Sequence, residues 1–285
     1  MGEIEKKKIL DNATYSEIVT YINEFDGLPM DCGLELHKVF SGIDGRTLES
    51  ILSTEIRRKV KSIYHKWAMK SSGLALSFDK KASTNPYKSD IVVNMAKETG
   101  LTPSMISRLL IAEKFKNKKK SDIADILKKS HLIPDPSLAL NIQSGICSDN
   151  LDGPIADMIR RYVGEEFEIR LKDQAKQAGL HYLDEAVLRR TGFDKTPDLK
   201  LAIPCLYKGK EVNWIESKAL FGDTKTHRQY LVQQLSSYSN RFGPGIIIYW
   251  FGYQEEIHQL QENSEGLIIL DDFPDKSHIE LLEIK

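Results

Sequence analysis

The spacing of apolar residues changes once along the chain, from a helical period to short strand-like runs. Between about Ser16 and Ala68 the apolar residues recur every three or four positions, which is the period of an amphipathic helix. After Leu180 the pattern changes to LKLAIPCLY, EVNWIESKAL, GIIIYWFGY and GLIIL, which predict β-strands. The segment THRQYLVQQLSSYSNRF, between the second and third runs, predicts a helix. We therefore expect a helical N-terminal region followed by an α/β region.

Two helices joined by a short turn are predicted at about residues 91–115. The first helix ends at Gly100, and Thr102 followed by Pro103 provides an N-cap and a first helical residue for the second. This arrangement is typical of a helix-turn-helix. The residues of the second helix that we expect near the surface, where they would contact DNA, are Ser104, Ser107 and Arg108.

A lysine-rich run follows the second helix and makes this part of the chain basic. From Lys88 to His131 there are 10 Lys and Arg residues against 5 Asp and Glu residues, so the segment has a net charge of +5. A nucleic-acid backbone favours such an excess by counterion release. Helix-turn-helix units also serve as packing elements, and lysine runs are commonly solvated helix ends, so the sequence leaves DNA contact open. The lysines concerned are Lys116, Lys118, Lys119 and Lys120.

Other breaks in the helical pattern suggest two domains. Residues 71–90 are rich in Ser, Gly, Asn, Pro and Lys, and we expect a loop there. The helical pattern from Ser137 to Leu180 is interrupted at residues 152–154, where Pro154 suits a helix start. We therefore predict a helical domain over residues 1–152 and an α/β domain over residues 153–285.

Composition describes an ordinary globular chain. The net charge is −1 and 28% of the 285 residues are charged, so any affinity for nucleic acid must come from local patches. The three cysteines, Cys32, Cys147 and Cys205, are far apart, which argues against disulfides or a zinc site and predicts reduced, buried thiols. No stretch has the roughly 18 apolar residues of a membrane span, so we expect a soluble, intracellular protein with no membrane partner.

Acidic and basic residues interrupt two of the predicted strands. Residues two apart in a strand share a face, so Glu216 and Lys218 project together. Asp198 precedes the partner strand, and the register of the pair decides whether it meets Glu216. A two-residue turn at residues 209–210 would put Asp198 on the wrong face. The site therefore requires an odd-length loop, such as five residues centred on Lys208, which places Asp198 opposite Lys218, or one bulge.

Two carboxylates with a lysine beside them indicate a metal site. Like charges need a compensating cation, and oxygen ligands favour Mg²⁺ or Mn²⁺. Asp198 and Glu216 would bind the cation, the backbone carbonyl of Ser217 would add a ligand, and Lys218 would act on the nucleophile or the transition state. This chemistry suits phosphodiester hydrolysis. The alternative is an exposed ion pair of Glu216 and Lys218 without chemistry, because an acid followed by ExK is common by chance.

The segments KTPDLKLAIP, WIESKALFGD and NRFGPGIIIYWFG resemble the codanin-interacting nuclease family, the TPD-motif branch of the PD-(D/E)xK nuclease superfamily. The resemblance implies a restriction-endonuclease-like α/β domain with metal-dependent deoxyribonuclease activity. It implies that Asp198 and Glu216 are the metal acids and that Lys218 is the catalytic lysine. It also implies a codanin-like partner and residence in the nucleus and cytoplasm, and relatives that resolve DNA junctions suggest a homodimer.

Two further segments are similar to elements of related nucleases. GEEFE resembles a helical motif that supplies an extra carboxylate, for which Glu168 is preferred over Glu166. QLSSY resembles a motif that places Gln234 and Tyr238 on one helix face at the active site, although both could be buried, satisfied polar residues. We expect His227, at the start of the same helix, to lie on the surface.

The predicted function is therefore metal-dependent hydrolysis of DNA by an activated water. A second hypothesis is a non-catalytic adaptor that binds DNA through the helical half and a protein through the nuclease-like domain.

Overall fold

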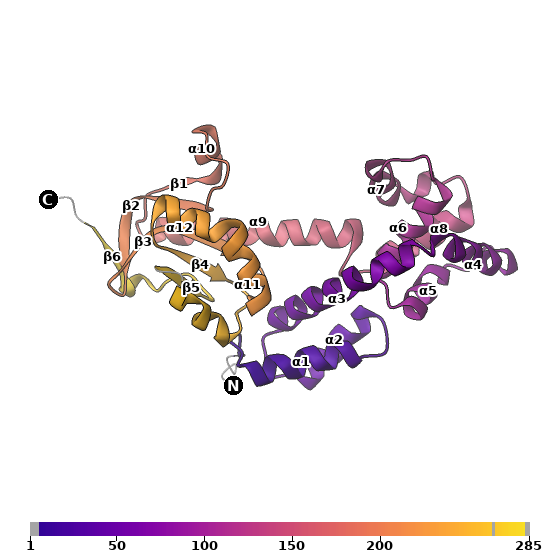
Figure 1. The fold of residues 1–285 in the computed structure, drawn as a ribbon, viewed down its shortest axis with the longest axis horizontal. Helices are drawn as coiled ribbons and strands as arrows, with labels where there is room; N and C mark the ends of the chain where they lie inside the picture. Colours follow the sequence, from indigo (N-terminus) through magenta and orange to yellow (C-terminus); the bar gives the residue numbers. More distant parts are fainter. Residues whose placement is uncertain (1–5, 264–265, 283–285) are drawn as a thin grey trace. The chain divides into compact units, whose positions relative to one another are not determined.

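The structure is a computed structural model that describes residues 6–263 and 266–282 (Figure 1). Its contacts divide the chain into two compact units. The sheet unit comprises Met1–Glu17, Gly42–Ser50 and Tyr162–Lys285, and the helical unit comprises Ile18–Ser41 and Ile51–Arg161. Three helices have residues in both units, namely α1 (Asn12–Glu24), α3 (Gly45–Ala68) and α9 (Gly153–Gln177). The predicted boundary at residues 152–153 stays a prediction.

The helical unit confirms the helical N-terminal region. Its other elements are α2 (Pro29–Val39), α4 (Ser71–Thr84), α5 (Ile91–Thr99), α6 (Pro103–Lys114), α7 (Lys120–Lys128), the 3-10 turn η1 (Ser130–Leu132) and α8 (Pro136–Cys147). The predicted loop at residues 71–90 is wrong for most of its length, because α4 occupies residues 71–84. Leu74, Ala75 and Phe78 form a buried stripe on this helix, which outweighs its polar composition.

Helices α5 and α6 have the boundaries that their capping residues predict. Gly100 ends α5 in the left-handed conformation at φ 72°, where a side chain would be strained. The Thr102 hydroxyl accepts a hydrogen bond from the backbone N–H of Met105 at 3.3 Å, and Pro103 is the first residue of α6.

The expectation that Ser104 and Ser107 lie near the surface is wrong. Both are buried, because α6 packs against α4, α5, α7 and α8. The Ser104 hydroxyl donates to the backbone carbonyl of Asp152 at 3.0 Å, and the Ser107 hydroxyl donates to the carbonyl of Pro103 at 2.9 Å. The small polar side chains therefore satisfy internal hydrogen bonds and allow close packing. Arg108, in contrast, is partly exposed.

The sheet unit contains a mixed, six-stranded sheet (Figure 1). Its strands are β1 (Tyr182–Asp184), β2 (Leu199–Tyr207), β3 (Lys210–Lys218), β4 (Gly245–Tyr249), β5 (Leu267–Leu270) and β6 (Ile279–Leu281). The order is β1-β2-β3-β4-β5, with β6 paired to β2; β1–β2 and β2–β3 are antiparallel, and β3–β4 and β4–β5 are parallel. All four predicted strands are confirmed.

Helices cover both faces of the sheet. The other helical elements of this unit are α10 (Glu185–Arg190), α11 (Thr224–Tyr230), the π-helix η2 (Leu231–Leu235), α12 (Ser236–Phe242) and the 3-10 helices η3 (Glu255–Asn263) and η4 (Lys276–His278). On one face, Phe167 and Leu171 of α9 pack against Ile215 and Ile248 of the sheet. On the other, Leu235 and Tyr238 pack with Trp214. The sheet is therefore the middle of three layers.

The register between β2 and β3 brings the predicted site together. A two-residue turn, Lys208-Gly209, joins the strands. Its φ angles are 48° and 75°, and positive φ at both residues is common in two-residue hairpin turns. Between the pairs Lys200–Trp214 and Cys205–Val212, β2 advances five residues while β3 advances two. Pro204 lies in this irregular stretch and cannot donate to the ladder. The structure therefore has three extra residues in β2 where one bulge was predicted. Because that number is also odd, the register continues to place Asp198 opposite Glu216, not Lys218.

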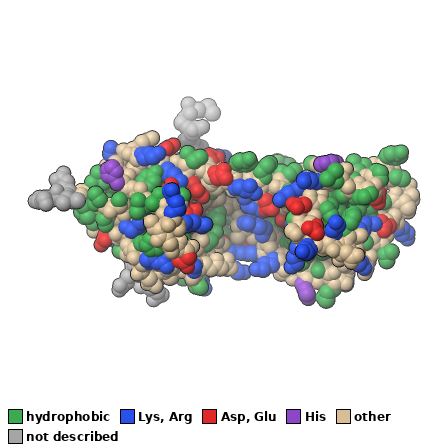
Figure 2. All heavy atoms as spheres, turned by 90° about the horizontal axis from the view of Figure 1, so that it is seen from above, with side chains coloured by type: hydrophobic (Ala, Val, Ile, Leu, Met, Phe, Trp, Pro, Cys, Tyr) green, Lys and Arg blue, Asp and Glu red, His purple; other side chains and the backbone are tan. Residues whose placement is uncertain are grey.

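The surface carries charges of both signs (Figure 2), and the exposure of the cysteines differs from one to another. Acidic and basic side chains are interspersed on the face shown in Figure 2, as the small net charge suggests. All three cysteines are free, but Cys147 is exposed, so its predicted burial is wrong; it ends α8, beyond the buried stripe of that helix. Within residues 6–263 and 266–282, no helix has the length and apolarity needed to cross a membrane.

Candidate active site

Asp198, Glu216 and Lys218 form one hydrogen-bonded cluster at the ends of β2 and β3. The Lys218 ammonium donates to Glu216 Oε1 at 2.6 Å, and the backbone N–H of Asp198 donates to Glu216 Oε2 at 3.2 Å. Asp198 Oδ2 in turn accepts from the backbone N–H of Ser217 at 2.7 Å. The Lys218 and Glu216 side chains are only 15% and 5% exposed, so this pair is buried and not a surface ion pair. The sequence therefore correctly grouped these three residues.

The cluster holds more negative than positive charge in a poorly solvated place. Burial, followed by the charge of Glu216, raises the pKa of Asp198 well above its usual value, against the opposing effects of the Ser217 N–H and Lys218. Burial also raises the pKa of Glu216, although Lys218 opposes this shift. For Lys218, burial acts to lower the pKa, but the charge and hydrogen bond of Glu216 outweigh it and the pKa rises. One ammonium thus compensates two carboxylates incompletely.

The helix after β3 fixes the position of Lys218. Gln234 Oε1 accepts a second hydrogen bond from the lysine ammonium at 3.1 Å, and the ring of Tyr230 lies 4.8 Å from the ammonium. Both residues flank or belong to the π-helical turn η2, a distortion that often occurs at functional sites. Sequence reasoning found Gln234 but missed Tyr230, although its spacing of four residues from Gln234 would have placed it on the same helix face.

Tyr238 lies elsewhere in the same layer and holds the loop before β2. It is buried, and its hydroxyl donates to the backbone carbonyl of Thr196 at 2.8 Å, two residues before Asp198. Its ring packs edge-on against Trp214 at 5.4 Å between centroids. Tyr238 therefore positions the TPD segment, Thr196-Pro197-Asp198, and its hydroxyl is already hydrogen-bonded.

His227 is not a surface residue as predicted. It is fully buried, with Nδ1 2.8 Å from the Tyr249 hydroxyl, and burial lowers its pKa to about 4. His227 faces Tyr249 of β4, whereas Lys225 in the same turn is exposed, so the position of a histidine near a helix start did not determine its exposure. Asp223 caps α11, accepting from the backbone N–H groups of Lys225 and Thr226.

Two further contacts surround the cluster. The Ser217 hydroxyl points to the other face of the sheet and accepts from the Trp250 indole N–H at 2.7 Å. On α9, the exposed Glu168 contributes a small charge effect that raises the pKa of Asp198, whereas Glu166 lies 3.9 Å from Arg46. Of the two acids, Glu168 is thus the one whose charge acts on the cluster.

The donor set is suited to a divalent cation that also binds water and substrate. In the part of the chain that the structure describes, no group of three or more His, Cys, Asp and Glu side chains is placed to hold a metal. Mg²⁺ commonly takes one or two protein carboxylates and completes its shell with water and phosphate oxygens. The two buried carboxylates, opposed by a single ammonium, fit that requirement.

The residues predicted to contact DNA differ in how accessible they are on the helical unit. Lys116 pairs with Glu113 at 2.8 Å, while Lys118, Lys119 and Lys120 are exposed around the start of α7. Ser104 and Ser107 are buried, so among the three residues predicted on α6 only Arg108 is accessible.

Comparison with known proteins decides the family. A protein of Xenopus tropicalis named CDAN1-interacting nuclease 1 is 34% identical over 277 residues, 94% of this chain and 89% of the relative. The chain belongs to the CDAN1-interacting nuclease 1 family. Members from Danio rerio and Homo sapiens are also 34% identical, over 96% and 84% of this chain and 92% and 87% of their own lengths.

A family model described as "Protein of unknown function TPD sequence-motif" matches residues 134–273 of this chain. The matched region includes Asp198, Glu216 and Lys218. No solved structure matches the chain. The predicted family resemblance is confirmed, and the named relatives are nucleases.

Proposed function

We propose that this protein is a divalent-metal-dependent nuclease that hydrolyses DNA phosphodiester bonds at the Asp198–Glu216–Lys218 cluster. The observation that carries the proposal is the buried cluster of two carboxylates and one ammonium, in which the Lys218 ammonium lies 2.6 Å from Glu216 and the charge of Glu216 acts on Asp198. Membership of a family whose named relatives are nucleases supports it. Charged side chains that are buried away from water, with strongly shifted pKa values, are typical of functional sites.

Asp198 and Glu216 are the residues that would hold Mg²⁺ or Mn²⁺. When bound, the cation makes a water molecule more acidic and offsets the charge that develops on the phosphate. The Ser217 N–H fixes the Asp198 carboxylate at 2.7 Å. Because the N–H and carbonyl of a strand residue point to the same side, the Ser217 carbonyl is a candidate ligand beside it. Glu168 is a candidate additional acid, because its charge acts on Asp198.

Lys218 supplies the positive charge that the protein itself contributes to the reaction. Its ammonium is held by Glu216 and Gln234 at 2.6 and 3.1 Å, which leaves one N–H for an incoming phosphate or for the attacking water. A preorganised donor in a poorly solvated site stabilises transition-state charge without reorganisation. Gln234 is a positioning residue for Lys218, and Tyr238 is a positioning residue for the TPD segment that ends at Asp198.

We further propose that the protein binds a codanin-like partner, because the relatives are named for an interaction with CDAN1. The nuclear and cytoplasmic location and the homodimer stay predictions.

Cleavage by full-length protein with Asp198→Asn or Lys218→Ala tests the proposed function. Labelled DNA substrates would be incubated with Mg²⁺, and circular dichroism would verify folding of each variant. We expect cleavage to fall at least about a hundredfold in both variants, while Lys80→Ala, on an exposed face of α4, cleaves as the wild type does. Equal cleavage by the two site variants and the wild type would refute the assignment. If the wild type and all variants bind DNA but none of them cleaves it, the non-catalytic adaptor is favoured.

A further inference from the structure

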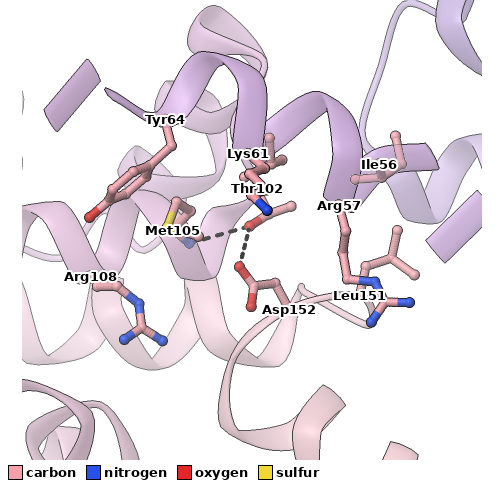
Figure 3. A pocket seen from close by; sticks show the side chains of 10 residues that line it. Ile56, Arg57, Lys61, Tyr64, Thr102, Met105, Arg108, Leu151 and Asp152 are labelled. Carbon is pink, nitrogen blue, oxygen red and sulfur yellow. Dashed lines mark hydrogen bonds between the residues drawn. The ribbon is translucent and has the colours of Figure 1, made fainter. Parts of the chain in front are cut away.

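A cavity of about 330 Å³ lies within the helical unit, between the second half of α3 and α6 (Figure 3). Much of its wall is apolar and is formed by Ile56, Val60, Met105 and Leu151. Tyr64 adds an aromatic ring. Small-molecule sites commonly have volumes of about 300–1,000 Å³, so this cavity has the size for a single small group.

Cationic side chains surround this apolar wall. Arg57 and Lys61 extend from α3, and Arg108 extends from α6 (Figure 3). Arg57 Nε donates to the Ser53 carbonyl at 3.1 Å. Lys61 and Arg108 have no hydrogen-bond or ion-pair partner among residues 6–263 and 266–282. The cavity therefore presents two cations that the rest of the described chain does not neutralise.

Asp152 is the one acid among the residues that line the cavity, and its carboxylate is hydrogen-bonded (Figure 3). Asp152 accepts from the backbone N–H of Gly153 at 2.7 Å and from the Thr102 hydroxyl at 3.4 Å. The helix that forms one wall is strongly basic. Between residues 57 and 78 the sequence has no Asp or Glu, and its six basic residues are Arg57, Arg58, Lys59, Lys61, Lys66 and Lys70. Trp67 follows Tyr64 in the same stretch, with the ammonium groups of Lys66 and Lys70 at 5.9 and 5.7 Å from its ring.

We propose that this cavity binds one nucleotide of a single-stranded nucleic acid. The base would lie against Tyr64 and Met105, and its phosphates would be held by Lys61 and Arg108. Aromatic rings interleaved with cations are the usual means of holding single strands, since every base has a flat face and every nucleotide has a charge. An acidic peptide would satisfy the cations but would not need the aromatic ring.

A duplex is a poorer occupant for two reasons. Its bases are stacked inside the helix and cannot enter a cavity of this size without being flipped out. In addition, α6, the second helix of the predicted helix-turn-helix, is packed against α4, α5, α7 and α8 and has most of its residues buried. It therefore cannot enter a major groove in the manner of a recognition helix. This inference deepens the proposed nuclease function, on which its biological meaning rests.

Fluorescence anisotropy with the full-length protein and a labelled twelve-nucleotide oligothymidylate tests the proposal. EDTA keeps the probe intact, so binding is measured without cleavage. We expect Lys61→Gln combined with Arg108→Gln to weaken binding about tenfold or more. Since each phosphate contact on a single strand contributes about 0.7 to the salt slope, the slope should fall by about 1.4. Tyr64→Ala should weaken binding by about tenfold and Tyr64→Phe should restore it. Lys80→Gln is the matched control.

Three results would overturn the proposal. They are unchanged oligothymidylate binding by the double variant, tighter binding of a duplex of the same length, and equally tight, variant-sensitive binding of a polyglutamate peptide. Thermal unfolding would verify that each variant is folded. Asp198→Asn separates this proposal from the proposed function, because that variant should lose cleavage and keep binding. Wild-type cleavage without cavity-dependent binding would reject the cavity alone, and binding without cleavage would reject the nuclease alone.

Discussion

The excess of carboxylates at the Asp198–Glu216–Lys218 cluster predicts opposite effects of two substitutions on stability. Asp198→Asn removes a negative charge from a buried site and should raise the free energy of unfolding. Lys218→Met removes the only ammonium and should lower it. Both variants should lose cleavage, so stability and activity would separate in the first variant and fall together in the second.

The magnitudes follow from the contacts. Asparagine retains an oxygen that can accept from the Ser217 N–H, which lies 2.7 Å from Asp198 Oδ2, so the charge is the main loss. Because burial raises the pKa of Asp198 in the folded protein, the unfolded chain releases its proton first as pH rises above the ordinary value of 3.8. Wild-type stability is therefore lost as pH rises from that value through the folded pKa. A buried group whose charge is incompletely compensated commonly costs about 1–3 kcal/mol, so we expect Asp198→Asn to gain at least about 1 kcal/mol above this window.

Lys218→Met should cost about 2–4 kcal/mol, because it leaves the 5% exposed Glu216 without its cation. Urea unfolding in EDTA at pH 4 and pH 8, followed by the fluorescence of buried Trp214 and Trp250, measures both effects. The gain from Asp198→Asn should be larger at pH 8 than at pH 4. Lys80→Met controls for loss of an exposed lysine. An Asp198→Asn protein that is less stable than the wild type at pH 8, or a neutral Lys218→Met, would refute this reasoning.

Three further predictions concern the frame around the site. Burial lowers the pKa of His227 from 6.5 to about 4, so as pH falls the unfolded chain binds a proton before the folded protein does. Between pH 6.5 and pH 4 this histidine should lower the stability of the wild type by up to about 3 kcal/mol, a loss that His227→Gln should not show. Parallel curves of urea midpoint against pH for the two proteins would contradict the role of His227. Tyr238→Phe loses the 2.8 Å hydrogen bond to the Thr196 carbonyl and should cost about 1–2 kcal/mol in urea unfolding and reduce cleavage less than Asp198→Asn; an unchanged urea midpoint would count against this role. Lys208 has φ 48°, so Lys208→Asn should stabilise the β2–β3 turn by about 0.5–1 kcal/mol, and a lower melting temperature would show that the turn is not strained.

The sheet and its chemistry could be predicted because their signals are local. The strand β2 begins and ends at the residues that the apolar run indicates, and alternation along β3 placed Glu216 and Lys218 on one face. The meeting with Asp198 depended on register, which hydrophobic alternation alone did not fix. Pro204 was the available signal for the irregularity that brings Asp198 opposite Glu216.

Burial of polar residues was the property that the sequence could not determine. Ser104, Ser107 and His227 have polar side chains, but tertiary packing covers each of them and internal hydrogen bonds satisfy the serine hydroxyls. The helix at residues 71–84 was missed for a similar reason, since three apolar residues facing the core outweigh many polar ones facing solvent. The basic stretch of α3 gave no sign of function until α6 was seen to form the opposite wall of a cavity.

The measurement that tests the central claim most directly is cleavage of labelled branched, flapped, single-stranded and duplex DNA with Mg²⁺, with Mn²⁺ and with EDTA. The wild-type protein and Glu216→Ala would be compared at equal concentrations. A metal-dependent nuclease centred on Glu216 should cut at least one substrate with either cation, not cut in EDTA, and lose activity in the variant. Cleavage that persists in EDTA or in Glu216→Ala, or no cleavage of any substrate by the wild type, would contradict the account.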